Sequence, residues 1–331
     1  MYHDVIHVKM NLRTLATGAR FAAPTGMKRV AFALLGFVAC TKDKPEQRAE
    51  KAVEKADFWP EALKPRTTKA PAKLLAYQPA NITNYVVKID AHTTPDAAAS
   101  VSAVMSLTLG FKPATSATSR DAYIRAIDMV TQAQGQGMKM TLGNEQLVVT
   151  DKGETTTLKR GDAGPMDVGK MLDLPFTTID FARGHVSNVG NPAHPFTAIG
   201  TNFLDDAMVL FPDLPAEPIE PGHTWKMVRT VSVGGSLGQT EVTYNFTYDG
   251  DGACPTSSTA SCADLSFSAS SPGITLSKEG ATFTAKYGFA GKVYLDLARG
   301  TVDESRVHMD MDIKGEGLSL PMVGTFVIKP T

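Results

Sequence analysis

The sequence predicts a mainly β protein built on a curved antiparallel sheet, as an open barrel or half-barrel with a few helices. Three observations lead to this expectation: several segments alternate apolar and polar residues with a period of two, few segments show helical spacing, and two closely similar turn motifs lie 116 residues apart. The repeated motif suggests two duplicated halves. A β-sandwich is the alternative, because two packed sheets require the same alternation.

Five segments carry the alternation. In the first half they are "YVVKIDA" (85–91) and "VSAVMSLTLGF" (101–111), and in the second half "TEVTYNFTY" (240–248), "ATFTAKYGF" (281–289) and "RVHMDMDIK" (306–314). Successive side chains of a strand point to opposite faces, so each segment has one apolar and one polar face. This is typical of antiparallel sheets, whereas buried parallel strands are apolar throughout.

Helical spacing is found in three segments. The longest is "RDAYIRAIDMVTQA" (120–133), which Ser119 can cap and in which Tyr123, Ile127 and Val130 would share one face of a helix. Shorter candidates are "PMDVGKML" (165–172) and "NFLDDAMVLF" (202–211). We expect these to be the few helices of the fold.

The repeated motif consists of "IDFARGHV" (179–186) and "LDLARGTV" (295–302). Each places a glycine, which adopts positive φ readily, after strand-like residues, as in a hairpin turn. We interpret the motifs as parts of duplicated half-repeats, about 85–199 and 225–331, joined by a proline-rich connector at 211–224. Chance similarity is the alternative, because aspartate and glycine are favoured in turns anyway.

The N-terminal region has the features of an export signal. Lys28 and Arg29 follow Met27 and precede ten uncharged residues, 30–39, which end at Cys40. Ten residues are too few to cross a bilayer as a helix, which takes about 20. We therefore interpret 27–39 as a signal peptide and 1–26 as a mis-start or leader; a buried N-terminal helix is the alternative.

The end of this signal, Phe37-Val38-Ala39-Cys40, resembles the lipobox of bacterial lipoproteins. The resemblance implies that Cys40 becomes the acylated N-terminus and holds the protein at a membrane of the cell envelope. Because Thr41 is not the aspartate associated with inner-membrane retention, the outer membrane is expected. The charged, proline-containing segment 40–76 would be a flexible tether, followed by a globular domain at 77–331.

The three cysteines fit this interpretation. Lipidation of Cys40 accounts for the odd one, and an exported chain meets oxidising conditions. Cys254 and Cys262 flank the turn-forming "PTSSTAS", so we expect a disulfide across a hairpin loop. A zinc site is the alternative, although neither a second cysteine pair nor a histidine pair lies nearby in the sequence.

Composition limits the partners. The chain has 33 basic and 34 acidic residues and a formal net charge of −1, which gives no electrostatic reason to expect nucleic acid as a partner. Hydrophobic residues make up 43% of the chain and charged residues 20%, enough apolar material for a real core. Contact with the membrane is therefore assigned to the lipid on Cys40.

No catalytic constellation emerges. "GGSLG" (234–238) matches the nucleophile elbow of serine hydrolases, but a strand-like segment follows Ser236 where that motif requires a helix. His308, Asp310 and Asp312 share a strand face and could bind a metal, but such a trio is more commonly the solvated side of an outer strand. We expect no catalytic residue, metal or cofactor, and no enzyme.

The remaining functional hypothesis rests on aromatic residues. Six of them give two strands of the second half an aromatic face that could hold an apolar, lipid-like ligand. In its one-sided alternation and few helices the chain resembles the LolA/LolB-type carriers of bacterial envelopes. The alternatives are a structural or assembly lipoprotein that binds another envelope protein, and an enzyme with a dispersed site. The candidate ligand-facing residues are Tyr244, Phe246, Tyr248, Phe283, Tyr287 and Phe289.

Overall fold

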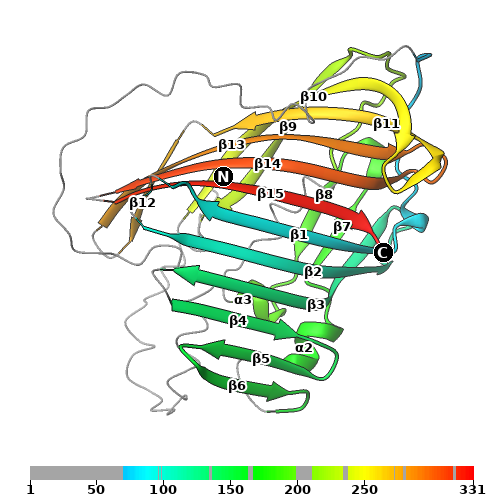
Figure 1. Ribbon diagram of the computed structural model, residues 1–331. Coiled ribbons are helices and arrows are strands. Elements are labelled where there is room, and N and C mark those ends of the chain that lie inside the picture. The colour runs from blue at the N-terminus through cyan, green and yellow to red at the C-terminus, as the bar shows by residue number, and fades with distance from the viewer. Residues whose placement is uncertain are drawn as a thin grey trace, which may run out of the picture.

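The computed structural model describes residues 70–95, 97, 99–133, 136–162, 167–198, 211–233, 238–271, 273–278, 281–315 and 318–331. Within them, fifteen strands form one antiparallel sheet in the order β6-β5-β4-β3-β2-β1-β15-β14-β13-β11-β10-β9 (Figure 1). Strand β12 pairs with β13, and β7 pairs with β3 and β8. The path runs from β6 to β9 without closing. The predicted fold class, a mainly β protein with an open antiparallel sheet, is confirmed.

The strands have the following bounds. The first half contains β1 (Asn84–Thr93), β2 (Val101–Pro113), β3 (Ser119–Ala133), β4 (Gln136–Leu142), β5 (Gln146–Asp151), β6 (Glu154–Lys159), β7 (Thr177–Asp180) and β8 (Ser187–Gly190). The second half contains β9 (Thr224–Val233), β10 (Gly238–Cys254), β11 (Ser257–Ser270), β12 (Ile274–Lys278), β13 (Ala281–Asp296), β14 (Thr301–Gly315) and β15 (Leu318–Pro330). The helices are α2 (Val168–Asp173), α3 (Pro195–Ala198) and two 3-10 turns, Pro79–Asn81 and Ala182–Gly184.

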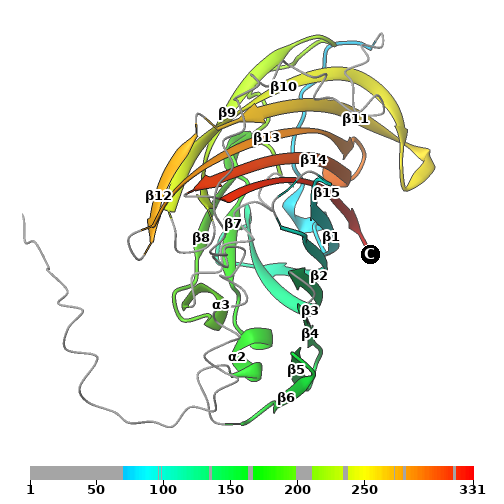
Figure 2. The ribbon, with the colours of Figure 1, turned by 60° about the vertical axis from the view of Figure 1, so that its left-hand side comes forward.

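The sheet is strongly curved, and β7, β8, α2 and α3 lie on its concave side, which we name the inner face (Figure 2). The alternation predicted from the sequence explains this arrangement. On β1, for example, Tyr85 and Val87 are 2% and 1% exposed on the inner face, whereas Lys88 is exposed on the outer face. All five predicted alternating segments lie within β1, β2, β10, β13 and β14.

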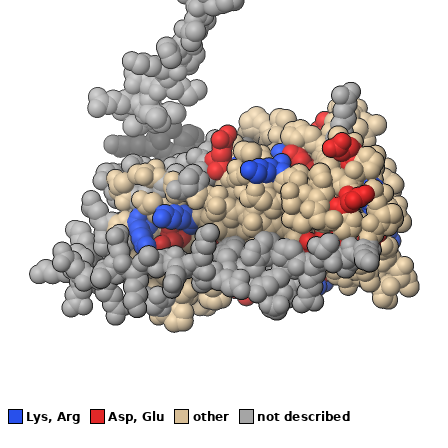
Figure 3. Space-filling model, turned by 90° about the horizontal axis from the view of Figure 1, so that it is seen from above, with Lys and Arg blue, Asp and Glu red and all other residues tan. Residues whose placement is uncertain are grey.

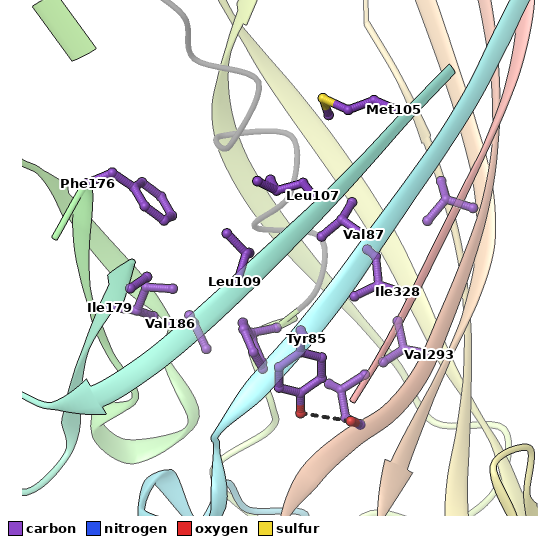
Figure 4. Close-up of a cluster of buried hydrophobic side chains, with 14 of the residues drawn as sticks. Tyr85, Val87, Met105, Leu107, Leu109, Phe176, Ile179, Val186, Val293 and Ile328 are labelled. Atoms are coloured by element: carbon purple, nitrogen blue, oxygen red, sulfur yellow. Dashed lines mark hydrogen bonds between the residues drawn. The ribbon is translucent and has the colours of Figure 1, made fainter. Parts of the chain in front are cut away.

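The first and last strands of the sheet domain are neighbours. Strand β1 pairs with β2 on one side, where Tyr85 lies opposite Leu109, and with β15 on the other, where Val87 lies opposite Ile328. One continuous sheet therefore joins the two halves, in place of the alternative β-sandwich. Figure 4 shows the core here, with Phe176, Ile179 and Val186, in and beside β7, among the side chains that gather with those of the sheet.

The longest predicted helix is wrong, because residues 119–133 form strand β3. A β-bulge explains the error. Thr108 of β2 pairs with Ala126 and Leu109 pairs with Ile124, so Arg125 is an extra residue. The bulge shifts the alternation by one position, so that inward residues Ile124 and Ile127 are three apart, as in a helix. The supposed helical face does not exist, because Val130 is 40% exposed on the outer face.

The prediction of a short helix near 165–172 is confirmed by α2. Asp167 caps it, since its side chain accepts a hydrogen bond from the Lys170 backbone N–H, and Met171 and Leu172 are buried. In the third candidate, 202–211, all but Phe211 lie outside the described residues. The part of the chain that the structure describes contains no helix long and apolar enough to span a membrane.

Both repeated motifs form hairpin turns with a glycine at positive φ, +78° at Gly184 and +59° at Gly300. The surrounding elements differ. Strands β7 and β8 have four residues each, whereas β13 and β14 have 16 and 15. In addition, α3 follows β8 and has no counterpart within 295–313. Equivalence is limited to the turns, and the duplication of whole halves stays a prediction.

The fold reaches a few residues before Tyr77. Lys73 forms an isolated β-bridge with Ile219 of the proline-rich connector, and Leu75 is buried. The connector has no other strand or helix from 211 until β9 begins at Thr224. Cys40 and the signal-like segment lie outside the described residues. Seen from above, acidic and basic side chains are interspersed over the described surface (Figure 3), in keeping with the near-zero net charge.

Candidate functional site

Aromatic side chains of four neighbouring strands form a continuous group on the inner face, which we name the aromatic ladder. Tyr244 of β10 lies between Phe246 of the same strand and Phe289 of β13, with ring centroids 6.4 and 6.1 Å away. Tyr287 extends the group, with its ring parallel to that of Phe289 at 6.4 Å. The sequence therefore identified four residues that the structure brings together.

Two members of the ladder were missed. Trp225 of β9 stacks on Phe246 at 5.5 Å, and Phe267 of β11 lies 5.1 Å from the same ring. Both are placed by the antiparallel register, which sets Phe246 directly opposite Trp225 on one side and Phe267 on the other. Alternation showed which way each residue points, but the neighbouring strand could not be identified from the sequence.

Glycine allows the ladder to cross β13. Gly291 lies opposite Phe267, and a Cβ atom at this position would lie 2.6 Å from the Phe267 ring and 2.5 Å from the Arg306 carbonyl oxygen. Any side chain here would displace the ring. A residue without a side chain thus lets Phe267 lie over the neighbouring strand.

The predicted ligand-facing residues differ in exposure. Tyr244, Phe246 and Phe289 are buried at 1%, 0% and 6%, whereas Tyr287 is half-buried. Tyr248 is buried but stands apart from the ladder, and its hydroxyl donates a hydrogen bond to Asp251 Oδ1 at 2.6 Å. Burial, followed by this hydrogen bond, raises the pKa of Tyr248. The side chain of Phe283 lies outside the described residues.

The ladder is one end of a longer apolar row that follows the curve of the sheet. Directly opposed residues continue it from β9 to β5, and we name this set the inner-face row. Its members are Trp225, Phe246, Phe267, Gly291, Val307, Phe326, Ile89, Met105, Met129, Met140 and Val149. No polar side chain interrupts it over eleven strands.

Exposure along the row is uneven. At its centre Ile89 and Phe326, which lie opposite each other on β1 and β15, are only half-buried. Met311 of β14 and Tyr287 of β13, which lie opposite each other, are also half-buried. Beyond Ile89 the row becomes methionines, whose flexible, polarizable side chains adapt to irregular apolar partners. These four half-buried side chains pack against the core and keep part of their apolar surface exposed at the middle of the inner face.

One end of the inner face is closed by an aromatic plug. Phe211, at the start of the connector, is fully buried, and the rings of Tyr77, Tyr85, Phe111 and Phe181 meet it edge-on at 5.2–6.0 Å. The Tyr77 hydroxyl donates to the Pro212 carbonyl at 2.9 Å, which ties the connector to the segment before β1. Burial raises the pKa of both Tyr77 and Tyr85.

Two of the histidines have structural surroundings. His194 is fully buried, stacks on Phe196 and makes a 3.1 Å hydrogen bond to the Met171 carbonyl, and burial lowers its pKa. His308 Nε2 lies 3.6 Å from Asp310 Oδ1 on the outer face. Asp312 pairs with Lys314 at 2.8 Å, so the trio is not gathered around one point.

A buried charged cluster on the second half was not predicted. Asp249 is the extra residue of a bulge, because Tyr248 pairs with Leu265 and Gly250 with Asp264. Its carboxylate accepts a 2.9 Å hydrogen bond from Ser266 and lies 3.3 Å from the Lys292 ammonium. Because the pair is buried, removing one partner would leave the other charge uncompensated and destabilise the fold.

The predicted disulfide is present. Cys254, at the end of β10, is bonded to Cys262 of β11, with the Cα atoms 5.0 Å apart. Both cysteines are buried. The bond closes the β10–β11 hairpin, the element for which the turn-forming sequence predicted it.

Comparisons with known proteins leave the family open. No protein-family model matches the chain, and neither does any curated protein. Among solved structures, a structure of lipovitellin, described for its lipid–protein interactions, is similar to this protein. The similarity covers 75% of this chain and 24% of that chain, with 9% identity and a TM-score of 0.39. The hypothetical lipoprotein YmcC from Escherichia coli (K12) is similar over 75% of this chain and 86% of its own, with 12% identity and a TM-score of 0.22. Function therefore has to be inferred from the chain's own residues.

Proposed function

We propose that the protein is an envelope lipoprotein that holds an apolar, lipid-like ligand on its inner face and performs no catalysis. The observation that carries the proposal is the inner-face row, an unbroken apolar path whose central members Ile89 and Phe326 are half-buried. Large accessible apolar surfaces on proteins are commonly binding sites. A ligand without strong polar groups fits best, because no polar side chain lies on the row.

The row also suits an elongated ligand. It spans eleven strands in one direction, with rings at the β9 end and three methionines followed by Val149 toward the β5 end. An acyl chain gains about 0.8 kcal/mol for each CH₂ group that it buries, so binding strength would grow with the length of row covered. Methionines would accommodate chains of different shape better than rigid side chains.

The test uses the full chain with Cys40→Ser, so that a bound lipid is distinguished from the covalent anchor. Native mass spectrometry and solvent extraction should find a small apolar molecule, or uptake of added fatty acid or phospholipid. Phe326→Ala and Tyr287→Ala should weaken uptake about tenfold or more, a loss of about 1.4 kcal/mol. Tyr123→Ala is the matched control, because Tyr123 is a half-buried tyrosine on the outer face.

Two results would overturn the carrier proposal. In one, the purified protein contains no small molecule and takes none up. In the other, Tyr123→Ala weakens uptake as much as Tyr287→Ala, which would mean that general stability and not the inner face controls the result.

The membrane anchor is a separate part of the proposal and rests on the sequence around Cys40. Labelling cells with a fatty-acid analogue should mark the wild-type protein and leave Cys40→Ser unlabelled, as an unprocessed or soluble form. Fractionation should place the labelled protein in the outer membrane, because Thr41 follows the cysteine. An unlabelled wild type would refute the anchor while leaving ligand binding testable.

A second candidate function, assembly with another envelope protein, is favoured by one observation. All four residues of β8 are exposed, Val189 at 74%, and among the described residues β8 pairs only with β7. An accessible edge strand can accept a strand from a partner. A photo-crosslinking residue at Val189 should then capture one protein, and the same residue at exposed Val104 of β2, a strand that is paired on both sides, is the control.

A further inference from the structure

Three groups that can bind metal ions converge beside the β10–β11 hairpin. The Cys254 and Cys262 sulfurs and a carboxylate oxygen of Asp303 all lie within 4.8 Å of one another. All three residues are buried, at 3%, 0% and 5% exposed. Asp303 is a third potential ligand. The sequence alone did not indicate it, because it stands 41 residues after Cys262.

A β-bulge brings Asp303 to this position. Tyr294 of β13 pairs with Glu304 and Leu295 pairs with Val302, which leaves Asp303 as the extra residue of β14. Bulges redirect side chains and are common beside functional sites. The redirected carboxylate is oriented by Thr256 in the hairpin loop, whose backbone N–H donates at 2.9 Å and whose hydroxyl donates to the other oxygen.

We propose that reduction of the Cys254–Cys262 disulfide creates a binding site for a divalent metal ion of the zinc class. The ligands are the two thiolates and the Asp303 carboxylate. Zinc is bound by cysteine sulfur and aspartate oxygen in tetrahedral geometry, and three protein ligands leave one position open. Thr256 becomes the group that orients the carboxylate, as hydrogen-bond donors beside metal ligands commonly do.

The chemistry balances with a dithiol as the reductant. The two sulfurs of the dithiol join in a new disulfide. The two hydrogens of the dithiol are transferred to Cys254 and Cys262, which become thiols. Each thiol then releases its proton to solvent when the metal binds, since the thiolate is the ligand form. The same residues thus close the hairpin in two ways, by a disulfide when oxidised and by a metal ion that also joins it to β14 when reduced.

The test uses the full chain with Cys40→Ser, in which Cys254 and Cys262 are the remaining cysteines. A phosphine reduces the disulfide, becoming a phosphine oxide with oxygen taken from water, and Co²⁺ is then titrated anaerobically. The reduced protein should bind one Co²⁺ with thiolate-to-cobalt charge-transfer absorption, and Zn²⁺ should displace it. The oxidised protein and a Cys254→Ser, Cys262→Ser variant should show no such absorption.

Asp303→Asn separates a ligand from a carboxylate that only anchors Thr256. A ligand role predicts Co²⁺ affinity at least about tenfold weaker, whereas Asp310→Asn, an aspartate on the outer face of β14, should change nothing. Equal affinity in wild type and Asp303→Asn would overturn the three-ligand site. Should Asp303→Asn fail to fold, the wild type still decides: no charge-transfer absorption after reduction, or no rise in melting temperature with Zn²⁺ in the reduced form, refutes the proposal.

Discussion

Replacing Asp264 with asparagine should stabilise the protein at neutral and alkaline pH and have no effect in acid. The pKa of the Asp264 carboxyl is raised to about 6, chiefly by burial and also by Asp249 and Asp251, against an opposing effect of Lys292. Among the described residues, its buried Oδ1 atom has no hydrogen-bond partner. Ionisation of this carboxyl therefore costs free energy in the folded state.

The sign and size follow from the two pKa values. In the unfolded chain the carboxyl ionises near its usual 3.8, so the folded protein holds the proton more tightly. The resulting stability is fully present below that value and is lost as the pH rises through about 6. The whole shift corresponds to about 3 kcal/mol. Because the carboxyl is only partly buried, solvent screening reduces the expected effect to about 1–2 kcal/mol.

Urea unfolding of wild type and Asp264→Asn at about pH 4 and about pH 8 measures the difference. Asp264→Asn should be more stable by about 1–2 kcal/mol at the higher pH and equal to wild type at the lower. Asp128→Asn, an exposed aspartate on the outer face of β3, is the control and should show no such gain. The reasoning is refuted if Asp264→Asn is destabilised at the higher pH or if its pH dependence matches that of wild type.

Three further changes test the packing. Gly291→Ala should cost about 2–3 kcal/mol of unfolding free energy by overpacking, while Gly137→Ala, whose added Cβ would meet nothing closer than 3.7 Å, should cost far less in the same urea titration. Phe211→Ala should cost about 3–5 kcal/mol, because it empties the aromatic plug; a loss below that of Gly137→Ala would exclude a packed plug. Reducing the Cys254–Cys262 bond should remove about 2–3 kcal/mol, and thiol counting on unreduced, folded protein should find neither cysteine reactive.

The sequence predicted which face of the sheet a side chain lies on better than it predicted which strands are neighbours. Alternation identified the inward residues of β10, including Tyr244 and Phe246, and both are buried. It could not show that Phe267 lies opposite Phe246, nor that β1 pairs with β15, because period-two alternation is the same whichever strand lies alongside. The fold class was therefore predictable, whereas the order of the strands was not.

Bulges account for much of what sequence reasoning missed. Each bulge inserts one residue into a strand, so the alternation of inward and outward residues before the bulge is shifted by one position after it. A strand with a bulge can therefore show helical spacing. That occurred at Arg125 in β3, where the longest helix was wrongly predicted. At Asp249 a bulge forms part of the buried charged cluster, and at Asp303 another completes the three-ligand group.

The extra residue is charged at all three of these bulges, and this has a physical reason. In a regular strand, a residue on the inner-face row is apolar, and a residue on the outer face is free to be polar. A bulged residue belongs to neither alternating set, so it can carry a charge between buried strands without interrupting the row. Asp249 and Asp303 are accordingly 1% and 5% exposed, yet the apolar row beside them stays unbroken. The curved sheet thus keeps an apolar surface for a ligand and polar chemistry at its bulges in the same strands, and substitutions at Asp303 should affect metal binding without affecting lipid uptake.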